Sequence, residues 1–529
     1  MRLQLDCYQR LVAEALLNQP PWQPQLQGAQ RAAAQANNLL FEACTDALLR
    51  RWGNHPQALL DLAAVLLQAG ALSRCEALLH WCHQLEPHSQ KPLLNLANLW
   101  LQTLRQAQAL ELYAQLEPSS NLLMALGYQE QQPAVATRQW AERWAQLQCS
   151  PRSPTSGLAQ SPPSGLLRLG FLSADFCQHP VGLFLLPLAE QLAAQPQIQL
   201  CFYDNSPRTD WLTECLQACG SWHRTQGHSD AQVADQIRAD QLSVLIDLGG
   251  HTARSRLPVL LQRPAPVQLS WLGYWATTGL AGVVDGVLAD PLVVPPASPE
   301  ERSFSEPVLR FPQCRWCFRP VPWMPAVVDP PCVESGWVTF GSFNSSAKLN
   351  HRLLRCWAGV LMAVPDSRLL LRNYQLQDFG LQQQIRQAFI DLGVNPRRLE
   401  LQGPCFHAEL LAAYSQVDIA LDPFPFNGGL TSCEALWLGL PLVTLAGTDQ
   451  AAVMAARQGL ALLQQIGRPE WIATSEAHYI AIAAKLAADP LALQEIRRQQ
   501  RARMQASSLC DASGFAAAFL KVVWSAVLA

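Results

Sequence analysis

No excess of positive charge is present in this chain of 529 residues, where 38 Lys and Arg stand against 41 Asp and Glu, for a net charge of -3. Proteins that bind nucleic acid need clustered cations to attract the phosphate backbone, so we expect no nucleic-acid partner. No stretch approaches the ~20 uninterrupted apolar residues that a membrane span requires. Asp6 and Glu14 interrupt any apolar run near the N-terminus, which argues against a signal peptide. The sequence therefore predicts a cytoplasmic protein with no membrane span.

The 16 cysteines do not form the pattern of a small disulfide-rich domain. Scattered through a long chain without a secretion signal, they are expected to be reduced and mostly buried. Cys314 and Cys317 form the one close pair, and a zinc site would need a second pair of ligands at a workable spacing. No such pair lies nearby, so we expect no metal site there.

A helical repeat is predicted near the N-terminus. Residues 55–87 have the pattern of two amphipathic helices hinged at Gly70, with Ala and Leu at the contact positions and a closing proline. This pattern is typical of a tetratricopeptide unit of about 34 residues. A shorter copy follows over 91–118, and the helical pattern fades through Trp144. Residues 1–148 are thus predicted to form a TPR-like α-helical domain whose groove binds proteins or peptides. The alternative is a helical bundle with no binding role.

The rest of the chain is predicted to form two α/β units. Residues 149–165 are rich in Pro and Ser and have the composition of an extended linker. After them, short apolar strands alternate with helical patterns, which predicts parallel, doubly wound sheets. We expect one Rossmann-like lobe over 166–332 and a second over 333–529, with a cleft between them.

Ligands of doubly wound sheets bind at the carboxyl ends of the strands, so polar residues at these ends are candidate site residues. A single histidine is more often structural than functional, but several here follow apparent strands. In the first lobe the cleft candidates are Ser173, Asp175, His179, His223, Gly250 and His251.

In the second lobe, Lys348 follows a strand at the start of a helix, where its ammonium could pair with a diphosphate. A glycine-rich turn then opens another helix. Its glycines let a ligand approach, its N–H groups and hydroxyls suit phosphate oxygens, and a carboxylate one turn later can bind ribose. These candidates are Asn427, Gly428, Gly429, Thr431, Ser432 and Glu434.

Several long segments resemble the O-linked N-acetylglucosamine transferase and SPINDLY family, over about residues 166–529. The matching text is LSADFCQHPVG, RPAPVQLSWLGYWATTG, FPQCRWCFRP, FGSFNSSAKLN and DIALDPFPFNGGLTSCEALWLGLPLVTLAG. The resemblance implies a GT-B fold of two Rossmann-like lobes behind the TPR-like region. It also implies an inverting enzyme that needs no metal and moves a sugar from a nucleoside diphosphate to a protein Ser or Thr. The chain contains no Asp-x-Asp, the usual cradle for a metal-bound sugar nucleotide, which agrees with that expectation.

The resemblance also implies roles for single residues. His179 corresponds to a histidine proposed as catalytic base or acceptor-side group, and His223 to a second active-site histidine. Lys348 corresponds to the lysine that holds the diphosphate. Thr431, Ser432 and Glu434 correspond to contacts with the phosphates and the ribose.

Three departures from the family pattern leave the nucleotide and the sugar open. Leu410 stands where relatives often carry a histidine, although His407 lies one turn earlier and could replace it. The residues that follow Gly447 differ from those of relatives, and Ser345 replaces an amide beside Lys348.

UDP-GlcNAc is the expected donor. The alternatives are O-fucosylation from GDP-fucose, glucose transfer to asparagine, and a TPR scaffold with inactive transferase lobes. Because the linker separates the helical domain from the cleft motifs, we expect that domain to select protein acceptors. A chain beginning near Leu166 would then still hydrolyse the donor slowly.

Overall fold

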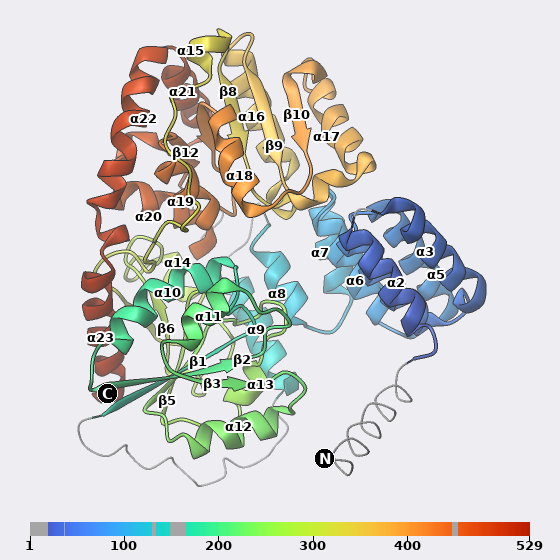
Figure 1. The fold of residues 1–529 in the computed structure, drawn as a ribbon, viewed down its shortest axis with the longest axis vertical. Helices are drawn as coiled ribbons and strands as arrows, with labels where there is room; N and C mark the ends of the chain where they lie inside the picture. The colour runs from blue at the N-terminus through green and yellow to red at the C-terminus, as the bar shows by residue number, and fades with distance from the viewer. Residues whose placement is uncertain (1–19, 36, 130–133, 149–165, 447–452, 529) are drawn as a thin grey trace, which may run out of the picture.

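The computed structural model describes residues 20–35, 37–129, 134–148, 166–446 and 453–528. It has a helical region followed by two α/β lobes (Figure 1). The predicted linker 149–165, the N-terminal segment with Asp6 and Glu14, and residues 447–452, where the departure after Gly447 starts, lie outside these residues. Within the described ranges, no helix has both the length and the apolar composition needed to cross a bilayer.

The helical region begins with antiparallel helix pairs. In the predicted repeat, Gly70 makes the turn between two helices with φ of +70°, a conformation that costs glycine little. A Cβ at this position would also lie 2.2 Å from the side chain of Gln377 in the second lobe. The helices of this part are α2 (Gln23–Ala34), α3 (Asn38–Trp52), α4 (Pro56–Gln68), α5 (Leu72–Leu85), α6 (Lys91–Leu101) and α7 (Gln106–Ala114).

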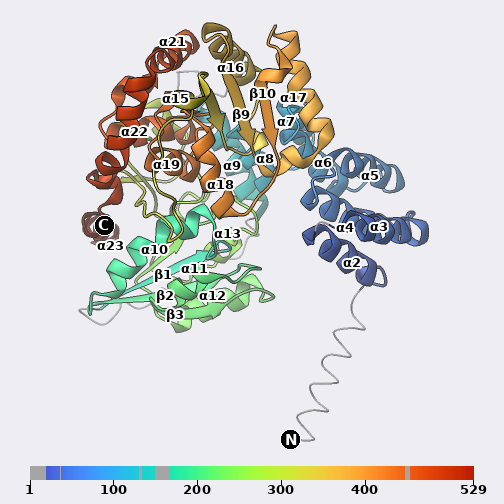
Figure 2. The same cartoon turned by 45° about the horizontal axis from the view of Figure 1, so that its top comes forward.

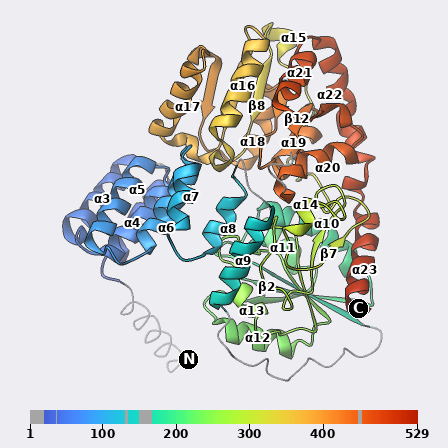
Figure 3. The ribbon, with the colours of Figure 1, turned by 180° about the vertical axis from the view of Figure 1, so that it is seen from behind.

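The next two helices, α8 (Ser120–Leu126) and α9 (Ala134–Gln148), pack against the first lobe (Figure 3). Leu122 and Trp144 share one buried apolar cluster with Tyr203 and Leu260 of that lobe. The predicted boundary at residue 148 is therefore not a boundary in packing, because α8 and α9 cover the same core as the strands that follow them.

The first lobe contains a parallel sheet of seven strands in the order β3-β2-β1-β4-β5-β6-β7. Helices cover the sheet, and most strands are continuous apolar runs, as expected where both faces are buried. The strands are β1 (Leu167–Ser173), β2 (Ile198–Asp204), β3 (Ser221–Arg224), β4 (Val244–Asp247), β5 (Val267–Ser270), β6 (Gly286–Ala289) and β7 (Val308–Arg310). The helices are α10 (Pro180–Ala193), α11 (Trp211–Gln217), α12 (Asp230–Ala239), α13 (Leu257–Leu260) and α14 (Pro299–Arg302).

The second lobe repeats this topology with a parallel sheet in the order β10-β9-β8-β11-β12-β13. Its strands are β8 (Thr339–Ser342), β9 (Arg368–Arg372), β10 (Leu399–Gln402), β11 (Ile419–Leu421), β12 (Leu442–Leu445) and β13 (Ile472–Ala473). Its α-helices are α15 (Cys332–Ser335), α16 (His351–Ala363), α17 (Phe379–Asp391), α18 (His407–Ala413), α19 (Leu430–Trp437), α20 (Gln458–Gln465) and α21 (Glu476–Ala487). The strand order reverses between β8 and β11, as it does between β1 and β4 in the first lobe. The predicted pair of Rossmann-like lobes of GT-B type is confirmed, with the lobes facing each other (Figure 2).

The last two helices connect the lobes. α22 (Pro490–Gln505) packs on the second lobe, and α23 (Ala512–Leu528) crosses to the first (Figure 1). Phe519 of α23 lies with its ring centroid 5.5 Å from that of Trp271 and 6.4 Å from that of Phe171, both in the first lobe. The end of the predicted 333–529 unit thus completes the core of the first lobe.

The part of the helical region that contains α5 and α7 packs against the second lobe. Asp378 caps two helices at once, because its Oδ1 accepts from Leu381 N of α17 at 2.8 Å and its Oδ2 from Leu72 N of α5 at 2.9 Å. The buried side chain of Gln106 donates to the backbone carbonyl of Leu349, next to Lys348. This contact ties the start of α7 to the loop that carries the candidate lysine.

Candidate active site

A cavity of about 600 Å³ lies between the two lobes, within the usual size range of small-ligand sites. Six of the predicted residues line it, contributed by the two lobes: His179, Lys348, His407, Gly429, Thr431 and Glu434. Residues of the helical region line it as well. Six of the predicted site residues therefore lie around one cavity.

Lys348 lies in the short 3-10 turn Ser346–Lys348 that follows β8. Its Nζ donates to Asn344 Oδ1 at 3.1 Å and to the carbonyl of Asn427 at 2.8 Å, and it stands 4.6 Å from the ring centroid of Phe426. Burial lowers the pKa of Lys348 to about 8, although the nearby Asp422 opposes this shift. No carboxylate within the described residues forms an ion pair with this ammonium, so it can pair with an incoming anion.

The glycine-rich turn places the start of α19 at the cavity. Gly429 occupies the N-cap position without a side-chain cap, so the first N–H groups of the helix remain available to a ligand. Gly428 is required by packing, because a Cβ there would lie 2.1 Å from Ser432 Oγ. Its N–H and the Ser432 hydroxyl both donate to buried Asp422, which fixes the turn.

Asn427, Gly428 and Ser432 shape this turn from behind and are not among the cavity-lining residues. Asn427 Oδ1 accepts from Gly459 N at 3.2 Å, and its Nδ2 donates to the Pro423 carbonyl at 2.9 Å. Thr431, which does line the cavity, donates to Asn344 Oδ1 at 3.1 Å. Asn344 thus joins Lys348 to the start of α19, which makes the lysine and the helix start one anion-binding unit.

Glu434 and His407 form a pair at another part of the cavity wall. His407 Nε2 lies 2.8 Å from Glu434 Oε1. Burial raises the pKa of Glu434, while the contact with His407 lowers it. Leu410, the departure noted in the sequence, also lines the cavity one turn along α18 from His407. The structure therefore places His407 beside Leu410 and the predicted ribose contact.

His179 caps the N-terminus of α10 and faces the cavity. Its Nδ1 accepts a hydrogen bond from Val181 N at 3.3 Å and lies 3.6 Å from Asp175 Oδ2. Burial lowers the pKa of His179 below its usual 6.5, so the ring is neutral near pH 7. Because Nδ1 is an acceptor in this geometry, the proton of the neutral ring resides on Nε2. Asp175 does not line the cavity, and its carboxylate partly opposes the lowering of the His179 pKa.

His223 does not contact the cavity. It lies within the edge strand β3, where its ring stacks on Tyr203 with centroids 5.2 Å apart. Its Nε2 lies 3.2 Å from Oδ2 of Asp240, the C-cap residue of α12. The prediction placed His223 after a strand, at the ligand-binding edge. The segment SWHR is itself the strand, and its histidine points to a neighbouring helix.

His251 is a buried link between α8 and the first lobe. Its Nε2 lies 2.9 Å from the Thr278 carbonyl and its Nδ1 3.0 Å from Ser120 Oγ, so Nε2 donates and Nδ1 accepts. Burial lowers the pKa of His251 to about 4. The neighbouring Gly250 donates to Asp247, and Ser173 accepts from Asp175 N. Neither they nor His251 line the cavity, and all three have structural partners.

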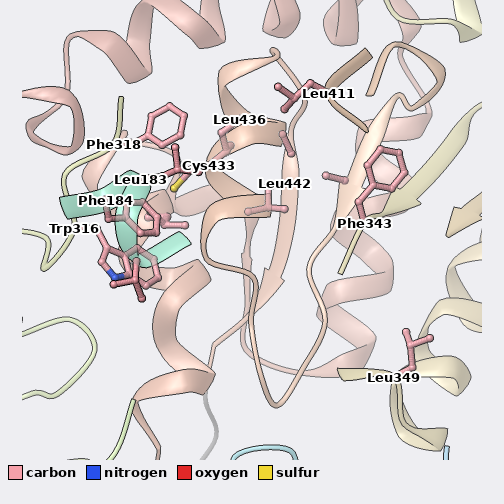
Figure 4. Packing of buried hydrophobic residues seen from close by; sticks show 14 of the residues in the cluster. Leu183, Phe184, Trp316, Phe318, Phe343, Leu349, Leu411, Cys433, Leu436 and Leu442 are labelled. Atoms are coloured by element: carbon pink, nitrogen blue, oxygen red, sulfur yellow. The ribbon is translucent and has the colours of Figure 1, made fainter. Parts of the chain in front are cut away.

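The loop that contains Cys314 and Cys317 contributes to the cavity with the two residues between them. Both cysteines are buried free thiols, and within the described residues no group of three or more His, Cys, Asp or Glu side chains could hold a metal ion. Trp316 stacks on Phe184 of α10, with ring centroids 5.1 Å apart (Figure 4). Trp316 also lines the cavity together with Arg315. Burial lowers the pKa of Arg315 to about 10. This loop thus forms part of the cavity wall.

Some cavity residues could not be identified from the sequence. Arg315 and Trp316 lie between two cysteines, and the sequence pattern drew attention to the cysteines alone. Met124 and Tyr128 come from the helical region, where nothing in the local pattern distinguishes them from core residues. Phe426 stands inside a predicted motif, but its aromatic ring gave no separate signal.

The chain matches the model of glycosyl transferase family 41 over residues 117–314 and 333–519. A probable UDP-N-acetylglucosamine–peptide N-acetylglucosaminyltransferase SPINDLY from Oryza sativa is 34% identical over 425 residues, covering 77% of this chain and 44% of that protein. The corresponding protein of Arabidopsis thaliana is 33% identical over 388 residues, covering 72% and 41%. The chain thus spans less than half the length of these two relatives.

A solved structure, that of a mutant Thermobaculum terrenum O-GlcNAc transferase, is similar over nearly the whole chain. It superposes with a TM-score of 0.84 at 29% sequence identity, covering 96% of this chain and 99% of that one. The similarity therefore extends over the helical region as well as both lobes.

Proposed function

The chain belongs to glycosyltransferase family 41, and on that premise we propose that it transfers N-acetylglucosamine from UDP-GlcNAc to Ser or Thr hydroxyls of proteins, with inversion and without a metal. The observation that carries this proposal is the joint placement of Lys348 and the uncapped start of α19 in the cavity between the lobes. The names of the relatives favour UDP-GlcNAc over GDP-fucose as the donor.

In this mechanism the acceptor hydroxyl attacks the anomeric carbon of the sugar, the bond between that carbon and the diphosphate oxygen breaks, and the hydroxyl proton passes to the departing diphosphate. Negative charge then grows on the β-phosphate. Lys348 and the N–H groups at the start of α19 are fixed in advance where this charge develops, which stabilises the transition state more than the ground state. Glu434, with His407 beside it, would bind the ribose.

The test is a panel of donors with the full chain. UDP-GlcNAc, GDP-fucose and UDP-glucose are each incubated with the enzyme and a protein extract, and the release of nucleoside diphosphate and the mass added to acceptors are measured. Selective use of UDP-GlcNAc is expected, with the sugar on Ser or Thr. Selective use of GDP-fucose, or addition of glucose to asparagine, would contradict the proposal.

Metal independence leads to a direct prediction. Lys348 and the helix start supply positive charge to the diphosphate, so UDP is expected to bind with the same affinity in the presence and absence of excess chelator. Isothermal calorimetry on chelator-treated protein checks this. An affinity that collapses in chelator and returns with Mg²⁺ or Mn²⁺ would show that a cation is needed.

His179 is proposed to orient the acceptor hydroxyl by donating from Nε2. In this tautomer Nδ1 already accepts from Val181 N and Nε2 carries the proton, so neither ring nitrogen has a lone pair free to take the proton of the substrate hydroxyl. The geometry therefore favours a role in orienting that hydroxyl over a role in deprotonating it. Losing a neutral hydrogen bond costs roughly twofold to tenfold, whereas losing a general base costs ~10²-fold to 10⁴-fold. His179→Ala is therefore expected to lower turnover by roughly tenfold or less, with unchanged affinity for UDP.

His179→Asn serves as the matched variant, because asparagine also caps helices and preserves the start of α10. Both variants should melt near the wild-type temperature, with His179→Asn the closer. A loss of turnover of ~10³-fold in both variants would restore the role of base. A loss of UDP affinity would instead move His179 to the donor side.

We also propose that the groove of helices α2–α7 selects the protein acceptors and that the reaction takes place in the cytoplasm. The repeat geometry around Gly70 supports the first statement, since such solenoids present a concave surface to peptides. The free thiols of the described cysteines are consistent with the second.

A further inference from the structure

Tyr128, just after α8, lines the substrate cavity although it belongs to the helical region. Its ring stacks on Phe426 of the second lobe, with centroids 5.0 Å apart and planes inclined by 20°. It also lies 6.2 Å from the ring of Trp275 in the first lobe. Three segments far apart in the sequence thus form one aromatic wall, which consists of Tyr128, Trp275 and Phe426.

The position of Tyr128 is fixed by contacts at both ends of α8. At the start, Ser120 Oγ lies 3.0 Å from His251 Nδ1. Further along, Tyr274 donates to the Leu123 carbonyl at 3.3 Å. At the end, a Cβ on Gly127 would lie 2.5 Å from the Trp275 ring, so glycine is needed for this close approach. These contacts hold Tyr128 against the first lobe.

The aromatic wall stands beside the candidate diphosphate site. Lys348 Nζ lies 4.6 Å from the ring centroid of Phe426, on which Tyr128 stacks. In a nucleotide sugar the sugar is bonded directly to the β-phosphate, so a diphosphate paired with Lys348 brings the sugar close to these rings. Aromatic faces suit the apolar face of a pyranose, and a phenol adds a polar group at the edge of the ring.

The hydroxyl of Tyr128 is available for such a contact. Within the part of the chain that the structure describes, no side chain or backbone group forms a hydrogen bond with it, whereas the hydroxyls of Tyr274 and Tyr414 both have partners. Burial raises the pKa of Tyr128 to about 12, so the hydroxyl stays protonated and can donate.

We propose that Tyr128 is a specificity-determining residue that contacts the donor sugar, with its ring against the apolar face of the pyranose and its hydroxyl bonded to a polar substituent. The proposal rests on the proposed function, since it takes a nucleotide sugar as the ligand. It assigns to the helical region a direct part in donor recognition, in addition to the selection of acceptors.

The experiment compares the affinities of the full chain for UDP and UDP-GlcNAc by calorimetry. The variants are Tyr128→Ala, Tyr128→Phe and, as a matched control, Gln129→Ala, whose side chain lies next in sequence but does not line the cavity. Tyr128→Ala should weaken UDP-GlcNAc binding by roughly threefold to tenfold and leave UDP binding unchanged. Tyr128→Phe should lose a smaller part of that affinity, and Gln129→Ala none. Melting temperatures identify any variant that has lost its fold. If Tyr128→Ala has lost its fold, the affinities of Tyr128→Phe test the proposal instead.

Three outcomes would overturn the proposal. Equal weakening of UDP and UDP-GlcNAc would place Tyr128 at the nucleotide or show a structural effect. Unchanged binding of both would show that the sugar does not contact it. A raised KM for the acceptor with unchanged donor affinity would place it on the acceptor side. If the wild-type chain binds another nucleotide sugar instead of UDP-GlcNAc, the proposed donor is wrong, and the same comparison with that compound and its diphosphate decides the role of Tyr128.

Discussion

Lys348→Ala is expected to lower turnover by ~10²-fold to 10³-fold while the protein remains folded, because removing one preorganised electrostatic partner of a transition state typically has this effect. In the proposed mechanism Lys348 supplies a localised charge next to the β-phosphate, and its hydrogen bonds to Asn344 and Asn427 fix its position before the donor binds. Steady-state kinetics of UDP release, with a melting curve of the variant, checks the result.

The pH dependence gives a second measure of the same residue. Burial holds the pKa of Lys348 near 8, below the usual 10.5 of lysine, so the ammonium form is lost as the pH rises through about 8. The value of kcat/KM should therefore be level below this pH and fall above it. Bound diphosphate favours the ammonium, so the fall in kcat should lie at a higher pH than the fall in kcat/KM.

Two further variants sharpen the test. Lys348→Arg should recover little activity, since a planar guanidinium does not fit a site built around a compact ammonium, and the alkaline fall should disappear because arginine stays charged. Lys485→Ala, an exposed lysine on α21, is the matched control and should behave as wild type. A Lys348→Ala enzyme within about threefold of wild type would contradict the assignment, since that is the loss typical of a solvated surface charge.

Removal of residues 1–165 is expected to abolish donor hydrolysis, whereas removal of residues 1–87 should preserve it. The first deletion takes Met124 and Tyr128 out of the cavity wall and strips α8 and α9 from the first lobe, exposing a buried apolar cluster. The second leaves α6–α9 in place and removes much of the proposed acceptor groove. The structure thus changes the expectation, drawn from the linker, that a chain beginning near Leu166 would be active.

Circular dichroism, size-exclusion chromatography and donor hydrolysis distinguish the two deletions. The chain from His88 should be monodisperse, hydrolyse UDP-GlcNAc, and modify fewer proteins than the full chain. A chain from Leu166 that is folded and hydrolyses the donor at the full rate would show that α8 and α9 do not belong to the catalytic unit.

The sequence predicted best what depends on local pattern. Apolar strands alternating with helices identified both sheets, and Lys348, Thr431 and Glu434 were placed because each follows a strand in a motif of glycines and polar residues. His223 and His251 met the same criterion of a nearby strand end, but neither reaches the cavity. A strand end restricts the backbone position, whereas the direction of a side chain depends on tertiary neighbours such as Asp240 and Thr278.

The features that the sequence did not predict depend on packing between segments far apart in the chain. α8 and α9 have the amphipathic pattern of the preceding repeats, and nothing within them indicates that their apolar faces cover the first lobe. The same holds for α23, whose Phe519 packs on Trp271 in the opposite lobe. Tyr128 lines the cavity for the same reason, since its position follows from where α8 packs.

The two lobes are connected on both sides of the cleft, and these connections affect how the donor enters and leaves. On one side of the cleft the helical region is fixed to the second lobe through Asp378 and to the first through Ser120. On the other side, α22 and α23 span both lobes. Wide hinge opening would have to break contacts on both sides, so donor exchange should proceed through movements of loops and side chains. Such movements take nanoseconds to microseconds, whereas domain hinging takes microseconds to milliseconds, so opening of the lobes is not expected to limit the rate of turnover.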